Sequence, residues 1–151
     1  MKMSRAVLTV GLAFGLSGAA WAGAPATGLG QQWPNAADLS RSPHYHVYTF
    51  DQNGVRYIQV NMLDGTVLGA IGTAGGQFIV LPIGNATQVS TPQQSATSTR
   101  STATSSASEV VYQDASTVIA ATPQSDGTTA LTAASTSLAC GDPTVCNSHS
   151  P

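Results

Sequence analysis

Four short apolar runs, separated by Asp51-Gln52-Asn53-Gly54, Asp64-Gly65 and Gly75-Gly76, constrain the fold of this chain more than any other feature. The runs are Tyr45–Phe50, Val55–Met62, Thr66–Ile71 and Gln77–Ile83. Aromatic and β-branched residues dominate three of them, which is typical of strands. Asn-Gly and Asp-Gly supply the positive φ angles that tight hairpins need. Because the connections are too short for helical crossovers, residues 35–84 are predicted to form a small, mainly β domain, an antiparallel meander of four strands.

The first turn allows two registers. A two-residue turn on Asn53-Gly54 pairs Phe50 with Tyr57, whereas a type I turn from Asp51 pairs Asp51 with Val55. The second register gathers one apolar face, and we favour it for that reason. That face would comprise His46, Tyr48, Phe50, Ile58, Val60 and Met62. The opposite, mixed face would comprise Tyr45, Val47, Thr49, Tyr57, Gln59 and Asn61.

The third and fourth runs contain residues that indicate where each strand lies in the sheet. Small residues at Gly69, Ala70 and Gly72 predict either a bend or the close approach of another part of the chain. Pro82 cannot donate to a strand ladder, so it predicts that the fourth strand lies at an edge.

The first 22 residues have the pattern of a signal peptide. Lys2 and Arg5 precede a short apolar stretch, and Ala20-Trp21-Ala22 has the small-x-small form of a cleavage site. The alternative is a membrane anchor, but the stretch is shorter than the roughly 20 residues that a spanning helix needs. We therefore expect export to the periplasm or the cell exterior, with no membrane span left after cleavage.

The segment between the leader and the first strand is predicted to have two parts. Residues 23–34 form a flexible lead-in, from which Trp33 packs onto the sheet. Residues 35–40 form a short helical turn, with Asn35 as its cap and Pro43 ending it before the first strand.

Residues 85–139 are rich in Ser, Thr and Ala and poor in charge. Such a composition buries too little apolar surface to offset the entropy of ordering, so the segment is predicted to be a largely disordered, low-complexity tail. The apolar island at 109–120 is a candidate hairpin within it. Residues 140–151 contain Cys140 and Cys146, which we expect to form one disulfide in an oxidising compartment.

The charge is sparse, with a net value of −2. No basic cluster is concentrated enough to bind phosphates, so nucleic acid is not an expected partner. The small core instead favours association with another protein, or with a second copy, through a sheet edge.

His44 and His46 are the candidate metal ligands. Positions i and i+2 of a strand share a face, so both imidazoles are able to reach one ion. The alternative is that both are ordinary residues at the start of a strand, and no cofactor is expected.

The sequence contains few features that would support a catalytic site. Most Asp residues lie in turn sequences, and no serine lies in a G-x-S-x-G elbow. The glycines of GAIGTAGGQ lack the Lys-Ser/Thr of a phosphate-binding loop. We therefore expect no enzyme and no catalytic residue.

The sequences HVYTFDQNGVRYIQVN and GQFIVLPIG resemble small exported hypothetical proteins of Gram-negative bacteria. The resemblance covers the leader and residues 33–84 and is moderately specific. It implies a periplasmic or secreted location but carries no assigned activity, so no site residue transfers from it.

The function expected from these features is that of an exported protein-interaction or structural module. Its candidate binding residues are Tyr45, Val47, Tyr57 and Gln59. The alternatives are a small ligand-binding or hydrolase-inhibitor protein and, after that, a metal-handling protein that uses His44 and His46.

Overall fold

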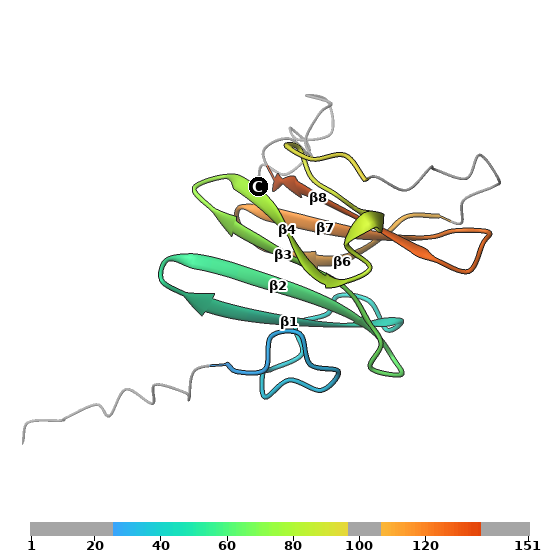
Figure 1. The fold of residues 1–151 in the computed structure, drawn as a ribbon, viewed down its shortest axis with the longest axis horizontal. Helices are drawn as coiled ribbons and strands as arrows, with labels where there is room; N and C mark the ends of the chain where they lie inside the picture. Colours follow the sequence, from blue (N-terminus) through green and yellow to red (C-terminus); the bar gives the residue numbers. More distant parts are fainter. Residues whose placement is uncertain (1–25, 97–106, 137–151) are drawn as a thin grey trace, which may run out of the picture.

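Two four-stranded sheets pack against each other in the computed structural model, which describes residues 26–96 and 107–136 (Figure 1). The strands of the first sheet are β1 (Tyr45–Gln52), β2 (Val55–Met62), β3 (Val67–Ala74) and β4 (Gln77–Gly84). Those of the second sheet are β5 (Val89–Ser90), β6 (Glu109–Gln113), β7 (Thr117–Pro123) and β8 (Thr129–Ser135). One turn of 3₁₀ helix, η1 (Ala86–Gln88), joins the two sheets.

The first sheet confirms the predicted meander. Its strands follow the order β1-β2-β3-β4, and each pair of neighbours is antiparallel. Pro82 lies in β4 at the edge of this sheet, as its missing N–H predicts.

The favoured register of the first hairpin is wrong. Phe50 pairs with Tyr57 and Asp51 with Arg56, because Asn53 and Gly54 both adopt positive φ angles, 52° and 79°, in a two-residue turn. Side chains are buried on both faces of β1 and β2, so the gathering of one apolar face did not identify the correct register.

The second sheet corrects the prediction of a disordered tail. The candidate hairpin is confirmed as β6 and β7, and β8 extends it on the far side of β7. The short strand β5 completes the sheet by pairing in parallel with β8. Small β-branched and Ala side chains supplied enough pairing surface for strands despite the low-complexity composition. The remainder of the predicted tail, residues 97–106 and 137–139, lies outside the described residues.

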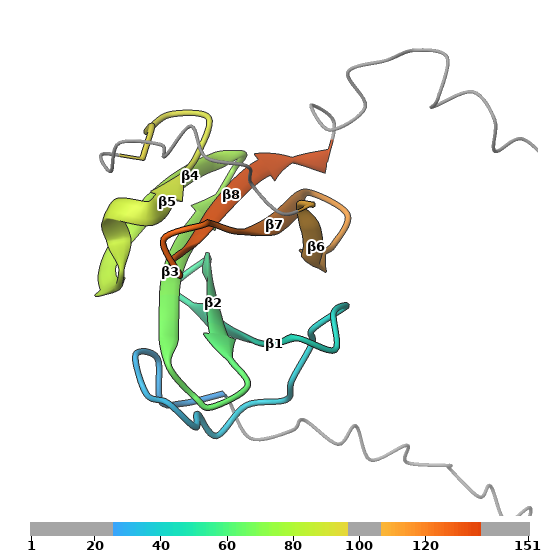
Figure 2. The ribbon, with the colours of Figure 1, turned by 90° about the vertical axis from the view of Figure 1, so that its right-hand side faces the viewer.

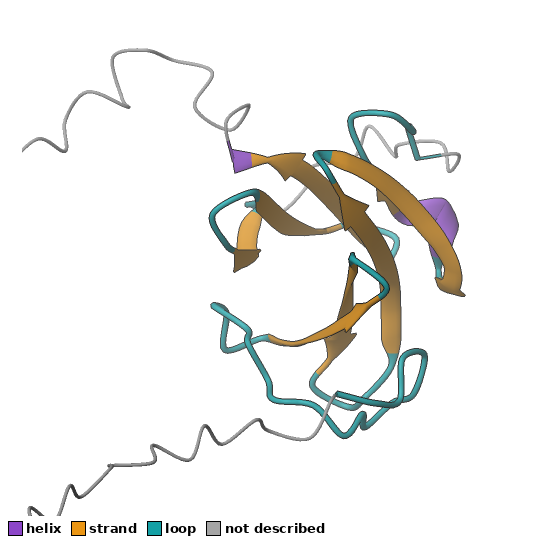
Figure 3. Ribbon diagram, turned by 90° about the vertical axis from the view of Figure 1, so that its left-hand side faces the viewer, coloured by secondary structure: helices purple, strands orange, loops and turns teal. Residues whose placement is uncertain are grey.

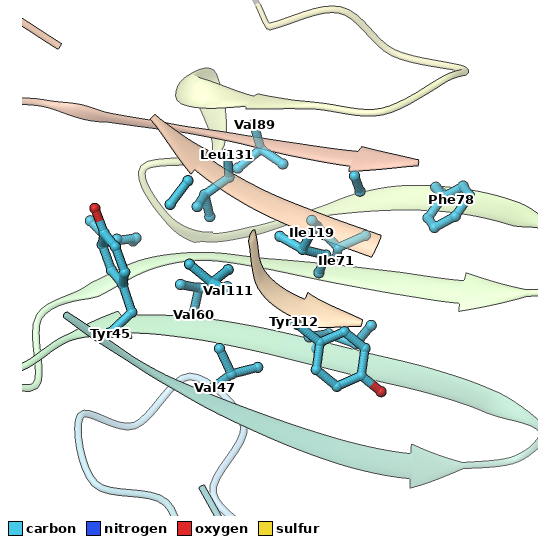
Figure 4. Packing of buried hydrophobic residues seen from close by; sticks show 14 residues of the cluster. Tyr45, Val47, Val60, Ile71, Phe78, Val89, Val111, Tyr112, Ile119 and Leu131 are labelled. Carbon is cyan, nitrogen blue, oxygen red and sulfur yellow. The ribbon is translucent and has the colours of Figure 1, made fainter. Parts of the chain in front are cut away.

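A single core fills the space between the sheets (Figure 4). Each sheet contributes fully buried side chains to it, among them Val47, Ile58, Val60, Ile71, Val89, Val111, Ile119 and Leu131. The predicted close approach is confirmed at Gly69, where an added Cβ would lie 2.8 Å from Cγ2 of Val89 and 3.2 Å from Cδ1 of Leu131. A glycine is therefore required where β3 meets the second sheet.

The helical turn predicted at residues 35–40 is wrong. Asn35 pairs with Thr27, and the chain then runs along the edge of β1, where the Leu39 N–H donates to the Val47 carbonyl at 2.7 Å. Two residues later the Arg41 N–H donates to the carbonyl of Val111 in β6 at 2.9 Å. This segment bridges the edge strands of both sheets, and backbone pairing outcompeted the weak helical signal. Figure 3 shows it as loop beside the strands.

Several predictions fall on residues outside the described ranges. They are the signal peptide at 1–22 and the disulfide between Cys140 and Cys146. Within residues 26–96 and 107–136, no helix has the length and apolar character that crossing a membrane requires.

Candidate functional site: an exposed tryptophan held on the first sheet

Residues 27–35, the N-terminal loop, lie against the face of the first sheet that points away from the second sheet (Figure 2). Two backbone hydrogen bonds between Thr27 and Asn35, of 3.2 and 3.0 Å, close the loop. The Gln31 N–H donates to the Gly28 carbonyl at 2.9 Å and forms a turn at its tip. The predicted flexible lead-in is therefore a defined loop over its described residues.

Two buried amide side chains of β2 bind the backbone of this loop. Oε1 of Gln59 accepts the Gly30 N–H at 2.6 Å, and Nε2 of Gln59 donates to the Gln31 carbonyl at 2.7 Å. Nδ2 of Asn61 donates to the Gln32 carbonyl at 2.8 Å.

Gln59 and Asn61 are both fully buried, and the Gln59 amide also donates to Oδ1 of Asn61 at 2.8 Å. An unpaired buried amide costs about 1–3 kcal/mol, so the two side chains and the loop depend on each other. The hydrogen bonds of these two amides with the loop backbone fix the position of the loop on the sheet.

The loop presents Trp33, a residue that is 57% exposed although its ring packs against the first sheet. The ring lies over Gly65, where an added Cβ would come within 2.9 Å of two indole carbons. Its centroid is 5.6 Å from that of His46, in an edge-on arrangement. Trp33 is thus supported by the sheet while much of its surface faces solvent.

His46 is in turn held by Asp38. Its Nδ1 lies 2.7 Å from Oδ2 of Asp38, and Oδ1 of Asp38 accepts the N–H groups of Val47 and Ser40 at 2.9 and 3.0 Å. Burial raises the pKa of Asp38, but the hydrogen bonds from His46, Val47 and Ser40 outweigh it and lower that pKa below its usual value. The ionised carboxylate therefore orients the imidazole that supports Trp33.

The four predicted binding residues do not share a face. Tyr45 and Val47 are buried in the core between the sheets. Gln59 lies on the opposite face and binds the N-terminal loop, and half-buried Tyr57 lies on that same face beside Phe50.

The two predicted metal ligands pair with separate carboxylates. Nδ1 of His44 lies 3.1 Å from Oε2 of Glu109, at the start of β6, while His46 pairs with Asp38. In the part of the chain that the structure describes, no three His, Cys, Asp or Glu residues are grouped to hold a metal ion.

A second polar region lies at the opposite end of the sheets. Arg56 pairs with Asp51 through Nε at 2.8 Å and with Asp114 through Nη1 at 3.1 Å, so it joins the two sheets. Beside it is an open hollow of about 360 Å³, lined by Asp51, Gly54, Arg56, Thr73, Ala74, Gly75, Gly76 and Ser116. Because the guanidinium already pairs with both carboxylates, we interpret Arg56 as a residue that joins the two sheets.

Burial raises the pKa of Asp114, but hydrogen bonds from Ser116, Tyr112 and Thr117 outweigh it and bring that pKa down to about 2. Asp114 is therefore a strongly held anion at the turn between β6 and β7.

No protein-family model, curated protein or solved structure matches this chain. The site must therefore be interpreted from its own geometry.

Sequence reasoning anticipated that Trp33 packs onto the sheet but missed the parts that hold it. Asp38 was assigned to a helical turn, and Asn61 to a mixed face without a partner. One signal was available: Gln59 and Asn61 are amides at i and i+2 that alternate with Ile58, Val60 and Met62, and amides buried in such a run require hydrogen-bond partners.

Proposed function

We propose that this chain is an exported protein-interaction module that binds its partner through Trp33. The observation that carries the proposal is a tryptophan that is 57% exposed and yet packed against Gly65 and His46. Tryptophan is enriched among the residues that dominate binding energy at protein interfaces. A ring already fixed in place loses little conformational entropy when it enters a pocket on another protein.

The surrounding structure supports contact through this loop rather than strand addition at the neighbouring edge. The edge of β1 is occupied by the backbone of Leu39, and the edge of β6 by that of Arg41. A strand added at either edge would have to displace these hydrogen bonds. The leader pattern of residues 1–22 supports export, and the partner is therefore expected in the periplasm or outside the cell.

The proposal is tested by capture of exported proteins on the immobilised chain. Trp33→Ala should lose a partner that the unchanged chain retains, with an affinity loss of about 2 kcal/mol or more if Trp33 is an interface anchor. Ile79→Ala is the matched control, because Ile79 is also 57% exposed and lies on β4. Circular dichroism of both variants should match the unchanged chain. Equal capture by the Trp33→Ala variant would refute the proposal.

A further inference from the structure

We infer that the partner bound through Trp33 is a protein that surrounds an apolar pocket with lysine or arginine side chains. The inference rests on the proposed function, because it names the chemistry of the partner that the same tryptophan binds. Two features of the end of the first sheet where Trp33 lies carry it. Exposed apolar residues gather there, and the two carboxylates beside them pair with no arginine of the described chain.

The exposed large apolar residues are concentrated where β2 turns into β3. Among the described residues six are exposed, and four of them lie at this end of the sheet: Trp33, Leu39, Met62 and Leu63. Met62 and Leu63 belong to the turn that ends at Gly65, on which the Trp33 ring packs, and Leu39 lies beside Val47 of β1. Figure 2 shows the N-terminal loop and this turn side by side at the bottom of the view. An exposed apolar cluster bordered by polar residues is typical of a protein-interaction site.

Two carboxylates border this apolar cluster. Asp64 lies in the same turn as Leu63, where its Oδ1 accepts the Thr66 N–H at 2.8 Å. Hydrogen bonds from Thr66 lower the pKa of Asp64, so the group is an exposed anion near pH 7. Asp38 lies on the other side of Trp33, where it holds His46. The indole is therefore flanked by negative charge.

Neither carboxylate pairs with an arginine. Arg41 and Arg56 are the only lysine or arginine residues in the described ranges. Nη1 of Arg41 donates to Oε1 of Gln113 in β6 at 2.6 Å, and Arg56 pairs with its two carboxylates at the opposite end of the sheets. The end of the first sheet around Trp33 thus combines apolar side chains with negative charge.

This combination favours one class of partner. At protein interfaces apolar anchors enter the centre, while opposite charges around them raise the association rate and exclude surfaces of like charge. A second copy docked on the same cluster would bring its own Asp38 and Asp64 toward these carboxylates, and an anionic lipid surface would repel them as well. A cationic rim around an apolar pocket is attracted by both carboxylates.

The test uses two synthetic peptides that differ only in charge. In one peptide leucines are flanked by lysines, and in the other glutamate replaces every lysine. The full chain carries Trp21→Phe, so that Trp33 is its only tryptophan, and its emission is followed at pH 8, where imidazole side chains are ordinarily uncharged. We expect the lysine peptide to shift the emission of Trp33 to shorter wavelength until it saturates. The glutamate peptide should leave the emission unchanged.

Asp64→Asn removes the charge but keeps the turn, because an amide oxygen also accepts the Thr66 N–H. The variant should bind the lysine peptide about threefold more weakly at low salt, and high salt should remove the difference. Asp126→Asn is the matched control. Asp126-Gly127-Thr128 repeats the sequence Asp64-Gly65-Thr66 in a turn of the second sheet, and the Thr128 N–H donates to Asp126 at 2.9 Å. This control removes the same charge and should leave binding unchanged.

Equal binding of the two peptides, binding of neither, or equal effects of the two Asn variants would overturn the inference. A shift of Trp33 emission with protein concentration alone would assign the cluster to a second copy, and a shift on phosphatidylcholine vesicles alone would assign it to a lipid surface. Either result would also overturn the inference. The capture experiment is decided separately: if Trp33→Ala loses its partner while the two peptides bind equally, the proposed function stands and only the partner chemistry is wrong.

Discussion

The two sheets share one core but differ in their outer faces. The first sheet turns large aromatic and amide side chains outward, and the N-terminal loop covers part of them. The second sheet turns small, uncharged side chains outward, namely Ser90, Val110, Val118, Ala120, Thr122, Ala130, Thr132 and Ala134. Buried amides on a face need hydrogen-bond partners at specific positions. A face of Ala, Thr and Val has few groups that need such partners.

The difference indicates where specificity lies in this molecule. Gln59 and Asn61 make hydrogen bonds at fixed positions, so they accept only one placement of the loop and of Trp33. No comparable set of buried amides is present on the outer face of the second sheet, among the residues that the structure describes.

The largest expected effect comes from the core that both sheets share. Leu131→Ala removes a fully buried side chain that packs near Gly69 and should lower the free energy of unfolding by about 2–5 kcal/mol. Thr132→Ala, at the next position and facing outward, removes only an exposed hydroxyl contact with Oγ of Ser90 at 3.2 Å and should change it by less than about 1 kcal/mol. Urea unfolding of both variants measures the difference. Equal effects would show that the inward and outward faces of β8 are misassigned.

The next largest loss of stability is expected when an amide is removed from the outer face of the first sheet rather than from that of the second. Gln59→Met keeps the side-chain volume but leaves the Gly30 N–H and the Gln31 carbonyl without their partner, and it should cost about 2–3 kcal/mol. Gln113→Met makes the same change at an exposed position of β6, where it removes only the exposed hydrogen bond from Nη1 of Arg41 at 2.6 Å, and it should cost less than about 1 kcal/mol. Thermal or urea unfolding measures both. A small cost at Gln59 would mean that the loop adds little to the first sheet.

A smaller loss of stability is expected at low pH from Asp114, one of the two carboxylates that pair with Arg56. The pKa of Asp114 is about 2 in the folded protein and 3.8 ordinarily, so the ionised group stabilises the fold above about pH 4. That contribution, about 2 kcal/mol, is lost as the pH falls from about 4 through 2. Asp114→Asn should therefore flatten the pH dependence of the unfolding free energy between pH 4 and 2. An unchanged slope in the variant would contradict the assignment.

Turn chemistry made the first sheet predictable. The second sheet has turn residues too, Asp114 between β6 and β7 and Asp126-Gly127 between β7 and β8, but the strands that they join were too poor in large apolar residues to predict. Asn53-Gly54, Asp64-Gly65 and Gly75-Gly76 mark every connection of the meander. The strands of the second sheet are made largely of Ala, Thr and Val. The placement of β5 beside β8 depends on pairing between residues that are distant in sequence. Local composition does not encode such pairing.

The candidate site was only partly predictable for a related reason. Gln59 was assigned as a binding residue, but on a face together with Tyr45 and Val47, because a register with one apolar face was favoured. That criterion assumes that one side of the sheet is solvated. Here the loop covers one side and the second sheet the other, so apolar and amide residues are buried on both.

Amide hydrogen exchange at Gly30 tests the central claim most directly. Its N–H is the one that Gln59 accepts at 2.6 Å. If the N-terminal loop is held on the first sheet, this amide exchanges more slowly than in an unstructured peptide, and Gln59→Met removes the protection while amides of β7 stay protected. Exchange of Gly30 at the unstructured rate in the unchanged chain would contradict the account, because Trp33 would then have no fixed support.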